Sequence, residues 1–172
     1  MKPSLKEFDS KVFNKEDFSF KDFSDFLFVD CKFVECNFSN VKFENTRLRY
    51  VSFVNCKFLG VDFSNCNNLI LDFSFEECYL SNCTFSEMKM KNFIFKNSKI
   101  LECDFNDNDL SHSNFENSDL SGTYFLKNNL SFSSFENSKN YIINPNENIL
   151  RKAKFSLPEA ISFLGFFDIE IV

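Results

Sequence analysis

Residues 28 to 43 read FVDCKFVECNFSNVKF, with a phenylalanine at every fifth position. The same spacing runs outward over residues 18 to 73 and, after a two-residue slip, over residues 80 to 135, where leucine, methionine or isoleucine replaces some phenylalanines. Only Asn68 breaks the series. The 172-residue chain holds 27 phenylalanines and no tryptophan. Such heavy use of one large side chain at a fixed spacing indicates a repeat.

A period of five fits neither a helix nor a flat strand. Five helical residues advance by about 500°, so successive phenylalanines would point in different directions. Along a straight strand, every second phenylalanine would flip to the opposite face. All the central residues can point inward only if the chain turns a corner in each unit. Asparagine and acidic residues are frequent two positions after the centre, and asparagine and aspartate tolerate the dihedral angles of tight corners.

Each unit also places a small residue two positions before the centre, as in CNFSN at 36–40 and SDLSG at 118–122. In this pattern the chain resembles the pentapeptide-repeat family over roughly residues 16 to 138. The resemblance implies an all-β fold, a right-handed quadrilateral parallel β-helix. It also implies four units, or about 20 residues, in each coil, and therefore about six coils.

Phenylalanines that lie one coil apart should stack, because neighbouring strands are about 4.8 Å apart. The rings at 85, 105 and 125 are expected on one wall and those at 95, 115 and 135 on the opposite wall. The core positions named by this register are Phe38, Phe58, Phe85, Phe95, Phe105, Phe115, Phe125 and Phe135. An interior filled in this way leaves no room for a substrate, so the sequence predicts a non-enzymatic protein that acts through its outer surface.

Three segments are expected along the chain. Residues 1–15 form an N-terminal cap. Residues 16–138 form the β-helix, with a two-residue slip near 76–77; the alternative is a slip at 67–68, where the centre is polar. Residues 139–172 contain an irregular excursion, a short capping helix and a tail.

The last segment carries helix signals, because Ser156, Pro158 and Glu159 form a capping box and Gly165 is placed to end the helix. Such a tail resembles that of the Qnr-type and mycobacterial fluoroquinolone-resistance pentapeptide proteins. The resemblance implies a homodimer formed through the tail, and binding to DNA gyrase or topoisomerase IV as a mimic of duplex DNA. The dimer residues would be Leu157, Ile161, Phe163, Leu164, Phe166, Phe167, Ile169 and Ile171. The alternative is a lid that only covers the last coil.

The cysteines, the histidine and the acidic residues do not form the pattern of a catalytic site or a metal site, and no cofactor is expected. All seven cysteines fall in the small inward register, and their five-residue separations do not match the spacing of zinc sites, so buried thiols are expected. His112, the only histidine, stands at a corner. Asp104, Asp107 and Asp109 lack the glycine and the closing glutamate of a calcium-binding loop.

Acidic residues are concentrated late in the repeats. Between residues 100 and 137 the only lysine or arginine is Lys127, and the formal net charge of the whole chain is −6. The expected acidic surface comprises Glu102, Asp104, Asp107, Asp109, Glu116 and Asp119. This charge argues against direct binding of nucleic acid, because phosphate contacts need clustered lysine and arginine.

No stretch approaches the roughly 18 apolar residues of a membrane helix, and the first residues do not read as a secretion signal, so a cytoplasmic protein is expected. Two functions stay open: a DNA mimic that binds a type II topoisomerase, and a general protein-interaction scaffold with an unrelated partner.

Overall fold

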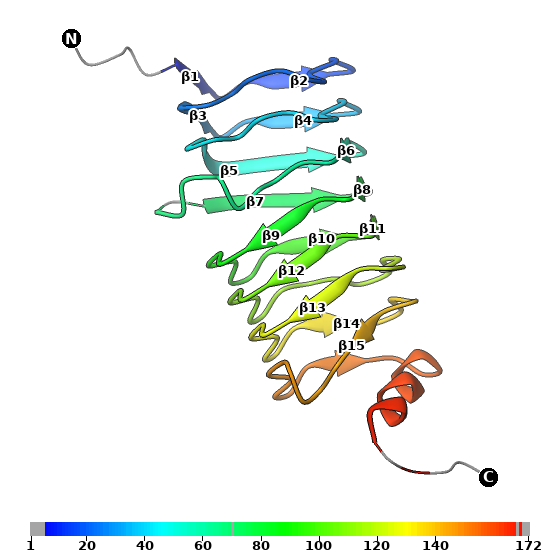
Figure 1. Ribbon diagram of the computed structural model, residues 1–172. Coiled ribbons are helices and arrows are strands. Elements are labelled where there is room, and N and C mark those ends of the chain that lie inside the picture. The colour runs from blue at the N-terminus through cyan, green and yellow to red at the C-terminus, as the bar shows by residue number, and fades with distance from the viewer. Residues whose placement is uncertain (1–5, 70, 168, 170–172) are drawn as a thin grey trace.

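The computed structural model describes residues 6–69, 71–167 and 169, and it is a parallel β-helix of about seven turns with one short helix at its end (Figure 1). The strands are β1 (Lys6–Asp9), β2 (Val12–Asn14), β3 (Phe26–Val29), β4 (Lys32–Val34), β5 (Arg47–Val54), β6 (Lys57–Leu59), β7 (Leu71–Glu76), β8 (Tyr79–Ser81), β9 (Thr84–Ser86), β10 (Ile94–Lys96), β11 (Lys99–Leu101), β12 (Asp104–Asn106), β13 (Tyr124–Leu126), β14 (Ser134–Phe135), β15 (Ile142–Ile143) and β16 (Lys154–Phe155). The helix is η1 (Glu159–Phe166).

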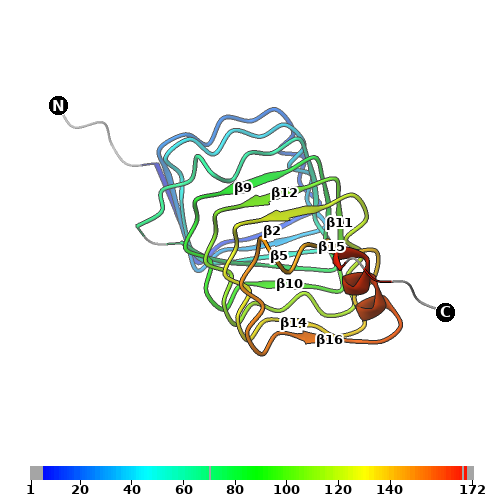
Figure 2. The ribbon, with the colours of Figure 1, turned by 60° about the horizontal axis from the view of Figure 1, so that its bottom comes forward.

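Parallel pairing sorts the strands into four walls, numbered here in chain order. Wall 1 begins with β1 and β3, wall 2 with β2 and β4, and strands β5 and β7 run around the corner between these two walls. Wall 2 continues with β10, β14 and β16. Wall 3 contains β6, β8 and β11, and wall 4 contains β9, β12, β13 and β15. Figure 2 shows β9 and β12 of wall 4 across the coil from β10 and β14 of wall 2.

Single residues with positive φ make the corners at five-residue spacing. Asp25, Asn40 and Glu102, for example, have φ values of 63°, 54° and 51°. In the described chain, glycine takes a positive φ only at Gly60 and Gly122. Asparagine and aspartate do occupy many corners, as predicted, because their short polar side chains tolerate this conformation.

Phenylalanine columns fill the inside, and the predicted stacking on two opposite walls is confirmed. Rings on wall 4 from Phe63 to Phe125 stack with centroids 4.6 to 5.0 Å apart, and rings on wall 2 with centroids 4.7 to 5.5 Å apart. The two columns meet edge to face, as between Phe85 and Phe95. Burial of each ring contributes roughly 1.5–3 kcal/mol before the loss of conformational entropy is subtracted. The wall 2 column is unbroken and consists of Phe13, Phe33, Phe53, Phe75, Phe95, Phe115, Phe135 and Phe155.

The predicted position of the slip at 76–77 is wrong. Strand β7 pairs with β5 so that Phe75 lies beside Phe53, which means that the second register has already begun at Phe75. Phe73 lies beside Val51 in the inward site that is usually small, and it is buried there. The extra residues therefore precede strand β7.

The chain leaves the regular coil within residues 67–69, at the alternative position for the slip. Leu69 is 90% exposed, and Asn67 and Asn68 lie at the surface rather than at a core centre. An asparagine at a core centre would have to replace its hydrogen bonds to water in an apolar column. A loop that points outward avoids this loss. After the loop the register is restored, and Phe73 occupies the inward site that is usually small.

Both ends of the β-helix extend further than predicted, which gives about seven turns instead of about six. Strands β1 and β2 pair with β3 and β4, so residues 6–14 belong to the first turn. The stretch 141–155 is a last turn rather than an irregular excursion, because β15 pairs with β13 and β16 pairs with β14. Tyr141 and Ile143 from this turn lie in the core.

The helix near the C-terminus is a 3₁₀ helix without the predicted capping box. Its N-cap is Pro158, which makes no side-chain cap hydrogen bond, and the Ser156 hydroxyl accepts a hydrogen bond from the backbone N–H of Asn137 instead. Phe163 anchors the helix, with its ring centroid 4.7 Å from that of Phe155 and 5.9 Å from that of Tyr141. The last coil ends in the aromatic rings of Tyr141 and Phe155, and the aromatic ring of Phe163 packs against both.

Candidate functional surface

The interior of the β-helix offers no binding site among the described residues. Buried or half-buried apolar side chains fill the core from Phe28 to Ile143, and three hollows lined by described residues are open on the outside. One hollow lies between walls 2 and 3 and is lined by Asn55, Cys56, Lys57, Leu59, Glu77 and Tyr79. Any binding function must therefore use the outer surface.

The small inward sites hold ladders of polar side chains that the sequence pattern did not indicate. Asn128, which is 1% exposed, donates from Nδ2 to the carbonyl oxygen of Phe105 and accepts the backbone N–H of Asn108 at Oδ1. Asn108 and Asn148 repeat the arrangement in the neighbouring coils. Backbone N–H groups point into these sites, so a side chain that both donates and accepts hydrogen bonds satisfies more of the backbone than an apolar one.

The cysteines occupy equivalent sites and are buried free thiols. The backbone N–H of Cys36 donates to Sγ of Cys56, and the N–H of Cys56 donates to Sγ of Cys78, each at 3.4 Å. Burial raises the pKa of the Cys66 and Cys78 thiols, which disfavours the reactive thiolate. In the part of the chain that the structure describes, no group of three or more metal-ligating side chains comes together.

The structure does not gather the six predicted acidic residues into one surface. Asp109 lies on wall 1, Glu116 on wall 2 and Asp119 on wall 3, so these three face different directions. Each forms an ion pair with a lysine one coil away, at 3.5 to 3.8 Å. The other three lie at wall 4 or at its corners, as described below.

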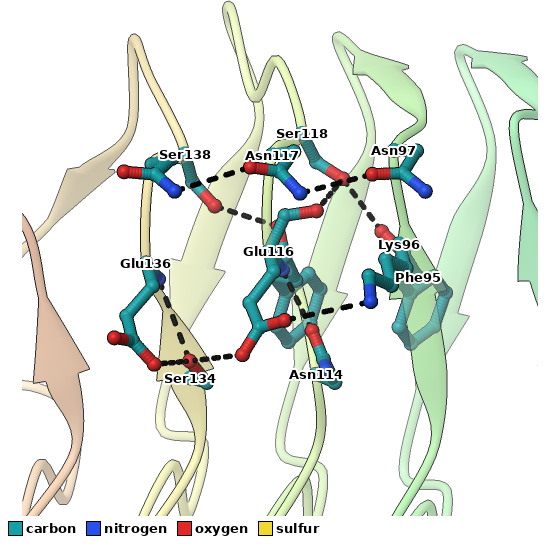
Figure 3. Close-up of polar contacts among 12 residues, drawn as sticks. Phe95, Lys96, Asn97, Asn114, Glu116, Asn117, Ser118, Ser134, Glu136 and Ser138 are labelled. Carbon is teal, nitrogen blue, oxygen red and sulfur yellow. Dashed lines mark hydrogen bonds and ion pairs between the residues drawn. The ribbon is translucent and has the colours of Figure 1, made fainter.

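Figure 3 shows how the charges on wall 2 are neutralised within the wall. Lys96 pairs with Glu116, and the Ser134 hydroxyl lies 3.0 and 3.1 Å from carboxylate oxygens of Glu116 and Glu136, within donating distance of either. Beside this row, the side chains of Asn97, Asn117 and Asn137 form a ladder of amide hydrogen bonds of 3.0 and 3.2 Å. Walls 1, 2 and 3 therefore present mixed charge, which is ordinary for a solvated surface.

Hydrogen bonds keep several surface carboxylates ionised. The hydroxyl and backbone N–H of Ser24 lower the pKa of Asp22, and Asn114 is the main cause of the lowered pKa of Glu116. Burial raises the pKa of Tyr141 to about 12, with a smaller contribution from Glu159. Among the described residues, the Tyr141 hydroxyl is the one buried side-chain polar atom without a hydrogen-bond partner.

Wall 4 and its two corners carry the unbalanced charge of the molecule, and we call this surface the acidic wall. Its acidic side chains are all exposed, and none of the ion pairs in the described chain includes one. The basic side chains on it are Lys21, Lys42 and Lys127. The acids are Asp22, Asp25, Glu44, Asp62, Glu87, Glu102, Asp104, Asp107 and Glu147. The acidic wall therefore has a formal net charge of −6, equal to that of the whole chain.

Sequence reasoning missed the acidic wall because it counted charge along the chain. Asp62 and Asp104, both on wall 4, are separated by about two coils of sequence, and the slip shifts the phase between them. Sorting the residues by their position in a coil, with a two-residue slip at either predicted position, would have revealed the wall. His112 lies at a corner, as predicted, and its ring stacks on Phe132 with centroids 4.9 Å apart.

The tail leaves apolar side chains exposed beyond the last coil. Phe163 and Phe166 are half-buried, whereas the rest of the predicted dimer residues in the described chain are exposed: Leu157, Ile161, Leu164, Phe167 and Ile169. Ile171 lies outside the described residues. The exposed dimer residues of the helix therefore point away from the coil that the helix covers.

Comparisons with known proteins agree with this architecture. The model of the family described as pentapeptide repeats matches eight copies, over residues 27–67 and 103–139. A trypsin-treated variant of QnrB1, a plasmid-mediated fluoroquinolone resistance protein, is 16% identical, with a TM-score of 0.61 and 98% of both chains covered. A second trypsin-treated variant of the same protein is 16% identical, with a TM-score of 0.56, over 97% of this chain and 92% of that chain. At this level of identity, the likeness concerns the fold alone.

No curated protein matches the chain by sequence. None of the helices in the described residues is long and apolar enough to cross a membrane.

Proposed function

This chain is a pentapeptide-repeat protein, and from that premise we propose that it is a non-enzymatic, cytoplasmic binding protein whose acidic wall occupies the DNA-binding surface of a type II topoisomerase. The single observation that carries the proposal is the concentration of unpaired negative charge on one wall of four. A surface of this kind fits a protein surface rich in lysine and arginine, and it repels nucleic acid and anionic lipid.

The spacing of the charges supports mimicry of DNA. The acidic wall extends from the first coil to the last, over about six spacings of about 4.8 Å, so its net charge of −6 amounts to roughly one charge per 5 Å. A single strand of B-DNA carries one charge per 3.4 Å or so. The wall thus presents charge at about two thirds of the density of one DNA strand. The fold similarity to QnrB1, a fluoroquinolone resistance protein, selects type II topoisomerases as the first partner to test.

The test is a gyrase supercoiling assay with added protein, with and without a fluoroquinolone. The variant Glu87→Gln/Asp104→Asn/Asp107→Asn removes three charges from the acidic wall, and we expect it to lower the effect on gyrase at least tenfold. The matched control removes three acids from the other walls, as Asp109→Asn/Glu116→Gln/Asp119→Asn, and we expect less than a threefold change. Because both variants have the same net charge, a difference between them reports the position of the charge.

Two outcomes would contradict the topoisomerase proposal. If the unmodified protein leaves supercoiling and quinolone inhibition unchanged at tenfold excess over gyrase, the partner is a different one, and the protein is a general scaffold. If both triple variants weaken the effect equally, overall charge rather than the acidic wall is responsible.

We also propose that two copies pair through their tails. The exposed tail residues form more apolar surface than a lid requires, and soluble monomers rarely leave such a patch uncovered. The opposite end of the β-helix is unsuitable for pairing, because exposed charged residues, among them Lys6, Lys11 and Lys21, occupy the inward sites of its first coil. Tail-to-tail pairing gives a closed two-fold arrangement, the commonest one among homo-oligomers.

Sedimentation velocity at micromolar concentration tests the pairing. Ile161→Asp places a charge within the proposed interface, and we expect it to convert a dimer into a monomer with unchanged circular dichroism. Ser162→Asp is the control, because this neighbouring helical residue is exposed and polar, and we expect it to stay dimeric. A monomer formed by the unmodified protein at this concentration would overturn the proposal.

A further inference from the structure

The C-terminal end of wall 4 differs in chemistry from the rest of that wall. Tyr124, Leu126 and Ile142 point outward from β13 and β15 and are 65%, 39% and 62% exposed. Tyr124 and Ile142 are paired neighbours in the sheet, so these side chains form one continuous patch, which we call the apolar end. In Figure 1 the strands of wall 4 follow one another from β9 to β15, and the apolar end occupies the last two.

The fold does not require apolar residues at these positions. Asp104 lies beside Tyr124 in the next coil, and Thr84 lies beside Asp104. Similarly, Asn106 lies beside Leu126, and Ser86 lies beside Asn106. Polar residues therefore stand at the corresponding outward sites of the two preceding coils. Contiguous exposed apolar patches, unlike single exposed apolar side chains, are typical of binding surfaces.

We propose that the apolar end is the contact centre for the same basic protein that the acidic wall attracts, and that it receives an apolar ridge beside that protein's lysine- and arginine-rich surface. This inference rests on the proposed function. Protein interfaces concentrate binding energy in a few aromatic and aliphatic side chains at their centre, with charged residues around them. Asp104 lies directly beside Tyr124, so the apolar end and the acidic wall can be covered by one partner.

The negative charge of the acidic wall argues against two other partners for the apolar end, a second copy of this chain and a membrane. A second copy that docked face to face on wall 4 would bring two surfaces with a net charge of −6 together, which is unfavourable. An anionic membrane surface would be repelled for the same reason. A basic protein is attracted over the length of the wall and can bury the apolar side chains at its end.

The test replaces the apolar end with residue types taken from the preceding coils, as Tyr124→Thr/Leu126→Ser/Ile142→Thr. Binding to purified gyrase is measured by surface plasmon resonance at several salt concentrations. We expect the variant to bind at least tenfold more weakly with an unchanged salt dependence. The acidic-wall variant Glu87→Gln/Asp104→Asn/Asp107→Asn should instead lose part of the salt dependence.

Two synthetic peptides of equal charge, one alternating lysine with leucine and the other alternating lysine with serine, separate this inference from the choice of partner. We expect the unmodified protein to bind the lysine–leucine peptide at least tenfold more tightly, and the apolar-end variant to lose this preference. If gyrase does not bind but the peptide preference holds, the topoisomerase proposal fails and the apolar end stands. If the variant binds both peptides like the unmodified protein, or changes the oligomeric state in sedimentation, the inference is wrong.

Discussion

Phe115→Ala should destabilise the protein by about 3–5 kcal/mol, the usual loss for a fully buried phenylalanine. The Phe115 ring is fully buried and stacks between Phe95 and Phe135, with centroids 4.9 and 4.7 Å away. Two further rings of wall 4, Phe105 and Phe125, meet it edge to face. Its removal therefore interrupts the wall 2 column and leaves a cavity that the rigid coils above and below cannot fill. Domains of this size are usually stable by only about 5–15 kcal/mol, so the variant should be close to unfolding.

Urea unfolding followed by far-ultraviolet circular dichroism measures this loss. Phe20→Ala is the matched control, because Phe20 is 77% exposed at a corner with a φ of 59°. We expect the control to change stability by less than about 0.5 kcal/mol, the usual range for surface substitutions. A Phe115→Ala protein that unfolds within about 1 kcal/mol of the unmodified one would mean that the column does not hold the coils together.

Asn128→Leu should cost about 2–4 kcal/mol although it makes the core more apolar. The leucine would remove the hydrogen bonds that Asn128 donates to the carbonyl oxygen of Phe105 and accepts from the backbone N–H of Asn108, both in a buried site. An unsatisfied buried polar group costs about 1–3 kcal/mol, and two buried hydrogen bonds are lost here. The loss should appear as a lower midpoint in urea with little change of slope.

Asn128→Ser tests whether hydrogen bonding is the cause. Ser118 fills the corresponding site on wall 3 and donates from its hydroxyl to the carbonyl oxygen of Phe95, as Asn128 does to that of Phe105. We expect the serine variant to lie between the unmodified protein and the leucine variant. A leucine variant at least as stable as the serine variant would show that packing, and not backbone hydrogen bonding, determines which residues occupy these sites.

The sequence by itself determined the repeat, the inward register, the corners and the stacked walls. Phenylalanines at every fifth residue can all be buried in one core only if the chain forms a coil with corners, so this spacing predicts the β-helix. The sequence also determined that the interior is filled, since side chains as large as Phe85 and Phe105 occupy most centres.

Only the tertiary structure decided which residues share a wall, because a shift of two residues moves every later side chain to a new neighbour. The slip at 67–69 places Phe75 rather than Phe73 in the wall 2 column, and Phe73 then fills an inward site that is usually small. The structure also decided the C-terminal end, where the aromatic contact between Phe163 and Phe155 replaced the predicted capping box at Ser156. Local signals such as a capping box stabilise a helix by only about 1 kcal/mol, so burial of an aromatic ring against the last coil outweighs them.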